Sequence, residues 1–150
     1  MNHTIESTRF GKLEIAGEAV IEFPDGLIGM GGTRFTLVAR EEGDAFYWLH
    51  SLDDPALAIP VTNPFQFFAD FAVELSDGEA DRIEIHDAAE ADVYVTVRAS
   101  EELEDVAANL LAPILISRGR GWQIINEAPG MPVRAPLFAG VSTQLPVEAA

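Results

Sequence analysis

The chain has 150 residues, 48% of them hydrophobic, and contains no cysteine. This length and apolar content suit one folded domain, and the lack of cysteine excludes disulfide frameworks, thiolate metal sites and cysteine nucleophiles. Nine basic and 25 acidic residues give a formal net charge of −16. Such a charge disfavours direct binding to nucleic acid or to an anionic membrane. It suits a basic protein partner, although it could equally serve only solubility.

The N-terminal segment has neither the cationic start nor the apolar run of a signal peptide, and no apolar stretch reaches the roughly 18 residues of a membrane span. We therefore expect a cytoplasmic protein. Internal repeats and low-complexity linkers are absent from the sequence. The sequence predicts one domain over residues 1–140 and a flexible tail over residues 141–150, where no periodic pattern continues.

In the first half of the chain, short apolar segments bounded by turn residues predict strands. The predicted strands are Leu13–Ile15, Val20–Phe23, Phe35–Ala39, Ala45–Ser51, Leu57–Val61 and Phe71–Leu75. The third and fourth should form a hairpin around the polar turn at residues 41–44.

In the second half, Ser76 and Glu79 have the spacing of a capping box, which predicts a short helix over Asp77–Ile85. The clearest strand of the chain is Asp92–Arg98, where valines alternate with other residues and one face should be buried.

The segment from residue 101 to 116 is ambiguous, because helical spacing gives way to a nearly continuous apolar run. Pro113 argues against one helix, so we expect a helical turn near Glu101–Asp105 and a strand over Leu110–Ile116 interrupted or edged at the proline. A last strand is predicted at Trp122–Ile125. The pattern indicates a mainly β, antiparallel sandwich or barrel with one or two short helices.

No cluster of residues indicates catalysis or metal binding. His50 and Ser51 lie near Asp53 and Asp54, but neighbouring strand residues point to opposite faces, so a hydrolase triad is disfavoured. His86, next to Asp87, follows the predicted helix, where a histidine often only complements the helix end. We therefore expect no enzyme activity, no cofactor and no metal ion.

The segment Asn63–Phe71 is unusual because it contains four of the nine phenylalanines of the chain. Exposed aromatic residues at this density often mark a protein-binding patch. The alternative is that both faces of the segment are buried, by the sheet on one side and by a covering loop on the other. The sequence does not decide between the two.

Four blocks of the sequence, in this order, resemble the signatures of the FliW family of flagellar assembly factors. They are Phe23–Gly29, His50–Ala58, Asn63–Phe65, and Asn109–Ile116 followed by Gln123. Each block alone has little specificity, but the ordered set spans about residues 6–138 and is specific as a whole.

The resemblance implies an antiparallel β-barrel-like fold and a partner switch. Proteins of this family bind flagellin and also bind the translational repressor CsrA, whose block on flagellin synthesis they relieve. Free flagellin displaces the regulator, so that synthesis follows secretion. A flagellin-only secretion chaperone, a small hydrolase or metal enzyme, and a structural homo-oligomer remain the alternatives, and we expect a monomer when the protein is free.

Hypothetical partner contacts follow from these blocks. Phe65, Phe67 and Phe68 would be apolar anchors, because central aromatic residues usually dominate the binding energy. Asp53 and Asp54 would form an acidic rim, which mainly sets the association rate. The block that begins at Asn109 would be a further contact, although its apolar run is more typical of a core.

Overall fold

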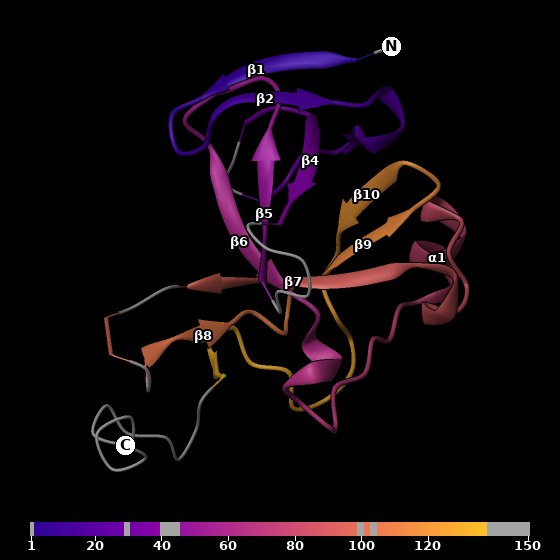
Figure 1. Ribbon diagram of the computed structural model, residues 1–150. Helices are drawn as coiled ribbons and strands as arrows, with labels where there is room; N and C mark the ends of the chain where they lie inside the picture. The colour runs from indigo at the N-terminus through magenta and orange to yellow at the C-terminus, as the bar shows by residue number, and fades with distance from the viewer. Residues whose placement is uncertain (1, 29–30, 40–45, 99–100, 103–104, 138–150) are drawn as a thin grey trace.

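In the computed structural model, seven strands close into a barrel (Figure 1). They are β3 (Ile21–Glu22), β4 (Arg34–Val38), β5 (Phe46–Ser51), β6 (Ala58–Thr62), β7 (Asp92–Arg98), β9 (Ile114–Ser117) and β10 (Arg120–Gln123). Neighbouring strands in the order β3-β4-β5-β6-β7-β9-β10 are antiparallel, and β10 closes the ring by pairing in parallel with β3 at Arg120 and Glu22. The predicted mainly β, barrel-like fold is confirmed.

The structure describes residues 2–28, 31–39, 46–98, 101–102 and 105–137. The predicted turn at residues 41–44, residues 103–104 of the predicted helical turn and the predicted tail lie outside these ranges. No helix in the described part of the chain is long and apolar enough to cross a membrane.

Shorter elements surround the barrel. In Figure 1 the hairpin of β1 (His3–Ser7) and β2 (Gly11–Ile15) lies over the upper end of the barrel, whereas the two-residue strands β8 (Ala107–Ala108) and β11 (Ala135–Pro136) extend the sheet beyond β7. The helices are η1 (Gly17–Ala19), η2 (Pro64–Gln66), α1 (Asp77–Ile83) and η3 (Ala88–Glu90). Of the hairpin, only β2 was predicted.

Strand β7 organises the fold because it pairs with three strands: β6, β8 and β9. Its valines at positions 93, 95 and 97 are buried on one side, while Tyr94 and Thr96 on the other side are half-buried. The predicted strand is confirmed, and protein covers both of its faces.

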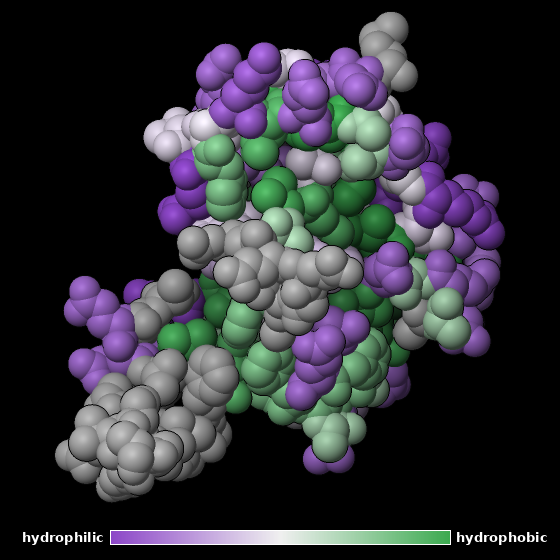
Figure 2. Space-filling model, in the orientation of Figure 1, coloured by the Kyte–Doolittle hydropathy of each residue, from purple (hydrophilic) through white to green (hydrophobic). Residues whose placement is uncertain are grey.

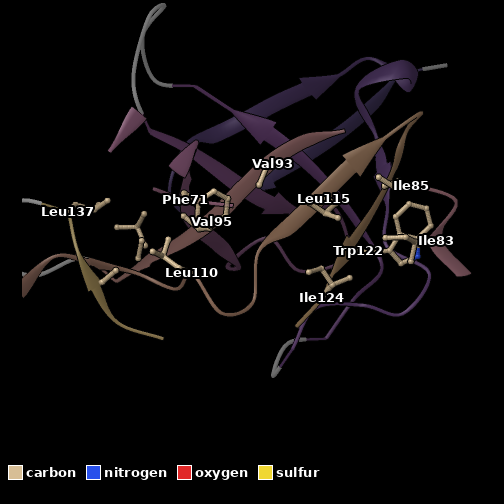
Figure 3. Packing of buried hydrophobic residues seen from close by; sticks show 13 residues of the cluster. Phe71, Ile83, Ile85, Val93, Val95, Leu110, Leu115, Trp122, Ile124 and Leu137 are labelled. Atoms are coloured by element: carbon tan, nitrogen blue, oxygen red, sulfur yellow. The ribbon is translucent and has the colours of Figure 1, made fainter. Parts of the chain in front are cut away.

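Two hydrophobic clusters lie on opposite sides of this part of the sheet. One fills the barrel and contains Ile21, Phe23, Leu27, Phe35, Leu49, Val61, Ile114 and Ile116. The other, which we call the outer hydrophobic cluster, contains Leu115 of β9, Trp122 of β10, the β7 valines and Ile83 of α1 (Figure 3). Successive residues of β9 thus enter different clusters, as the period of two in a strand requires. Each fully buried Leu, Ile or Val contributes about 1.5–3 kcal/mol.

Helix α1 forms close to the predicted position but ends earlier. The Ser76 hydroxyl accepts a hydrogen bond from the Glu79 N–H at 3.2 Å, which is half of the predicted capping box. The other half is absent, because the Glu79 carboxylate binds Arg82 and the Ser76 N–H donates to Glu127 at 3.0 Å. The helix stops at Ile83, since Glu84 has a left-handed backbone with φ of 60°.

The prediction of a strand at Phe71–Leu75 is wrong, although the segment does alternate between buried and exposed residues. Asn126 takes the place of a neighbouring strand: its side chain accepts from the Glu74 N–H at 2.9 Å and donates to the Ala72 carbonyl at 2.8 Å. Because a side chain satisfies these backbone groups, the extended segment joins no sheet.

The predictions after residue 105 are partly right. Pro113 does interrupt the apolar run, but the strand β9 begins only at Ile114, and residues 109–113 form a connection from β8. The predicted strand Trp122–Ile125 is β10, which lies two residues earlier.

Candidate protein-binding surface

The aromatic segment (residues 65–71) leaves the barrel at the end of β6. Asn63 caps η2 by accepting a hydrogen bond from the Phe65 N–H at 2.9 Å, and Pro64 occupies the first helical position and is buried. The Phe68 N–H donates to the Pro64 carbonyl at 2.9 Å. These bonds wind the segment into a defined turn, so its side chains have fixed directions.

The phenylalanines of this segment differ in exposure. Phe71 is buried in the outer hydrophobic cluster, while Phe67 and Phe68 are half-buried against it. Phe65 is 50% exposed, and its ring meets the ring of Phe71 edge to face at a centroid distance of 5.1 Å. The two predictions from sequence, an exposed patch and a buried segment, are thus each right for part of it: Phe65 is exposed, whereas Phe71 is buried.

Phe65 is thus a large apolar side chain held in place by a buried one. Gln66, Ala69 and Asp70, which follow it, are also exposed. In Figure 1 the magenta turn in the lower part of the view is η2, and at that place Figure 2 shows green apolar surface beside purple polar side chains. An exposed aromatic ring that is already fixed loses little conformational entropy on binding, which suits an interface anchor.

Asp53 lies in the turn between β5 and β6 and connects this turn to the start of β4. Its carboxylate accepts from the N–H groups of Thr33 at 3.1 Å and Arg34 at 3.2 Å, and it pairs with the Arg34 guanidinium at 2.9 Å. The Arg34 side chain, followed by the backbone bond from Thr33, lowers the pKa of Asp53 below its ordinary value. This carboxylate therefore joins the β5–β6 turn to the start of β4 by hydrogen bonds and an ion pair.

Asp54, the second residue of the predicted rim, shapes the same turn. Its carboxylate accepts from the Ala56 N–H at 2.9 Å, and its own N–H donates to the Ser51 hydroxyl at 2.9 Å. The residue is exposed, so its charge reaches the solvent.

Asn109 has a local structural role. Its side-chain oxygen accepts from the N–H groups of Leu111 and Ala112, both at 3.1 Å, and its own N–H donates to the Thr96 carbonyl at 3.0 Å. The half-buried side chain thereby turns the chain between β8 and β9.

The structure does not bring the six predicted residues into one patch. Asp53 and Asp54 precede β6, whereas Phe65 and the other phenylalanines follow it. The five residues of β6 extend over about 16 Å at roughly 3.3 Å per residue. The acidic and aromatic residues therefore lie at opposite ends of this strand, and Asn109 belongs to a third connection.

His50, the residue that suggested a hydrolase, is fully buried. Its Nδ1 lies 2.7 Å from the Ser51 carbonyl and its Nε2 lies 2.7 Å from the Ser7 hydroxyl. A carbonyl can only accept, so Nδ1 carries the proton, and in the neutral ring Nε2 then accepts from the Ser7 hydroxyl. The Ser7 oxygen also accepts from the N–H groups of Arg9 and Phe10. This network fastens the β1–β2 hairpin to β5.

His86 is exposed and pairs with Asp81 at 2.8 Å. The hydrogen bond that His86 donates to the Asp81 carboxylate raises the pKa of His86 above its ordinary value. No group of three or more His, Cys, Asp or Glu side chains that could hold a metal ion occurs in the part of the chain that the structure describes.

Comparisons with known proteins agree with one another. The sequence model of the family described as FliW protein matches residues 4–137. The flagellar assembly factor FliW of Alkaliphilus metalliredigens is 35% identical over 128 residues, covering 83% of this chain and 79% of that protein. The protein of the same name from an Exiguobacterium species is 38% identical over 136 residues, covering 89% and 93%.

A solved structure shows the same fold. The crystal structure of the flagellar assembly factor FliW superimposes with a TM-score of 0.81 at 27% identity, and the match covers 91% of this chain and 97% of the other.

Proposed function

The chain belongs to the FliW family of flagellar assembly factors, and from this membership we propose that it binds flagellin and antagonises the translational repressor CsrA. In this proposal the protein couples flagellin synthesis to flagellin secretion. It acts in the cytoplasm as a monomer, contacts neither nucleic acid nor membrane directly, and uses one domain over residues 1–140.

The observation that carries the proposal is the family match over residues 4–137, because it includes all of the barrel and the aromatic segment. Two features of the chain itself support a binding role. Phe65 offers a fixed, half-exposed aromatic ring. The net charge of −16 favours encounter with a basic partner such as an RNA-binding regulator.

The switch requires that the protein lowers the affinity of CsrA for RNA. Binding away from the RNA surface achieves this only if the protein has different affinities for two states of the regulator. Flagellin releases the regulator either by sharing its surface or by the same kind of coupling between two sites. In both cases the two partners weaken each other's binding by the same factor.

Calorimetric titration of the purified protein with flagellin and, separately, with CsrA at moderate salt tests the proposal. We expect both to bind, and we expect saturating flagellin to weaken the binding of CsrA. Binding of flagellin alone would instead describe a secretion chaperone. Binding of neither partner to a well-folded sample would refute the proposed function.

A further inference from the structure

A cleft with an apolar floor lies between β4 and the β9–β10 hairpin. Its volume is about 570 Å³. The apolar side chains that line it include Ala19, Ile21, Leu37, Ala91 and Ile116. In the view of Figure 2, green surface is visible between the positions of β4 and the β9–β10 hairpin, and purple side chains border it. The cleft is therefore an open apolar surface within a polar rim.

One wall of this cleft is a strand edge. The ladder between β3 and β4 ends at the pair Ile21 and Phe35, because the next residue toward the N-terminus that could pair, Ala19, belongs to η1. The Ala19 carbonyl instead accepts from the Thr36 hydroxyl at 2.9 Å. Beyond Phe35, β4 therefore has no neighbouring strand on this side among the residues that the structure describes.

The backbone of Leu37 faces that open side. The Arg34 carbonyl accepts from the Leu52 N–H at 2.8 Å, so residues 34, 36 and 38 direct their backbone groups toward β5. Alternation along an antiparallel strand then directs the N–H and C=O groups of Leu37 toward the cleft. An extended peptide can satisfy such groups by adding as a strand.

The described residues at the rim of the cleft carry an excess of negative charge. Of these lining residues, Glu18, Glu90 and Asp92 are acidic and Arg118 is the one cation. The Glu90 carboxylate accepts from the N–H groups of His86 at 2.9 Å and Asp87 at 3.0 Å, which fixes its position. A ligand with positive charges on either side of an apolar group would therefore match this cleft.

We infer that the cleft binds an extended segment of a partner protein in which an apolar side chain is flanked by lysine or arginine. The inference rests on the proposed function, and of its two partners we assign this segment to CsrA. A regulator that binds RNA must carry an excess of basic side chains, because phosphate contacts supply much of RNA affinity, and the segment proposed here would be a basic one outside the RNA surface. The apolar side chain would enter the cleft, and the segment would pair with Leu37 of β4.

Two variants test the cleft, and a third serves as the control. Ala19→Trp places a large ring at the mouth of the cleft, from a residue that is exposed in the free protein. Glu18→Lys reverses one rim charge at an exposed position. Glu14→Lys makes the same change in net charge on the exposed side of β2, and Glu14 is not among the residues that line the cleft. Thermal unfolding checks that each variant is folded.

The readout is calorimetric titration of each variant with CsrA and with flagellin. We expect Ala19→Trp to weaken CsrA binding by at least about 10-fold and Glu18→Lys by about 3- to 10-fold, with little effect of Glu14→Lys. Flagellin binding should stay unchanged in all three. CsrA binding at wild-type strength in both cleft variants would overturn this inference alone. Failure of the wild-type protein to bind CsrA would overturn the proposed function and the inference together.

Discussion

Gly121 of β10 lies directly against the ring of Phe23. A Cβ atom at position 121 would stand 2.5 Å from Cε2 and Cζ of that ring, closer than side chains can approach. Phe23 is fully buried in the barrel interior and meets Phe35 edge to face at 5.4 Å, so its ring cannot swing into solvent. The absence of a side chain at Gly121 therefore permits the packing where β10 closes the barrel onto β3.

We expect Gly121→Ala to lower the free energy of unfolding by about 1–3 kcal/mol, because overpacking displaces side chains and backbone. Urea unfolding followed by circular dichroism measures the change. Gly78→Ala in α1 is the matched control: an added Cβ there meets nothing within 4 Å, and alanine favours a helix. A Gly121→Ala protein with the wild-type urea midpoint would contradict the packing described.

Ser7→Ala tests the hydrogen-bond network beneath the β1–β2 hairpin. The change removes the donor to His50 Nε2 and the acceptor of the Arg9 and Phe10 N–H groups. A buried acceptor left without a partner costs about 1–3 kcal/mol. We expect the substitution to speed amide hydrogen exchange in β1 and β2 and to change it less in the barrel strands, which keep their own ladders. If exchange in β1 and β2 is the same in wild type and variant, this role of Ser7 is refuted.

The strands with regular alternation were predictable from sequence, because burial on one face dictates a period of two. This holds for β7, whose valines are buried in alternation, whereas β4 and β5 form close to their predicted bounds without alternating burial. It fails at Phe71–Leu75, where the alternation is real but Asn126, 51 residues after Leu75, supplies the hydrogen bonds. No local pattern reveals such a partner.

The partner-binding hypothesis from sequence was limited in a different way. Asp53 and Phe65 are only 12 residues apart, and the intervening segment was predicted as a strand. That prediction already implies opposite strand ends, so the separation of acidic rim and aromatic anchors could have been inferred. The cleft could not, because it depends on where the β3–β4 ladder stops.

Asp53→Asn should weaken the contacts that join the β5–β6 turn to the start of β4, because it removes the ion pair with Arg34. We expect a loss of about 1 kcal/mol at neutral pH, typical of hydrogen bonds to a partly exposed charged group. The pKa of Asp53 is lower in the folded protein. The stabilisation is therefore fully present above the unfolded-state pKa of about 3.9 and is lost as the pH falls through the folded-state pKa.

The measurement is urea unfolding of wild type and variant between neutral and acid pH. The difference in the free energy of unfolding between wild type and variant should be constant near pH 7 and should shrink below about pH 4. Asp54→Asn is the control, because it removes the same charge, leaves the ion pair between Asp53 and Arg34 in place, and keeps an oxygen that can accept from the Ala56 N–H. A difference that grows toward acid pH would show that the Asp53 carboxylate is not stabilised as its contacts indicate.

Phe65→Ala separates binding from folding in the aromatic segment. Phe65 is half-exposed, so its truncation should cost less than about 1 kcal/mol of stability, whereas Phe71→Ala should cost about 3–5 kcal/mol because Phe71 is buried. If the charged cleft receives the basic regulator, the aromatic surface is left for flagellin. We therefore expect Phe65→Ala to weaken flagellin binding by about 10-fold or more, as loss of an aromatic anchor does.

Calorimetric titration with flagellin measures the binding, and thermal unfolding measures the stability of the same samples. Gln66→Ala is the matched control, since Gln66 is an exposed neighbour in η2 without an aromatic ring. Wild-type affinity for both flagellin and CsrA in a stable Phe65→Ala protein would show that the exposed ring is no anchor. In that case the contact between Phe65 and Phe71 would serve only to cover the outer hydrophobic cluster.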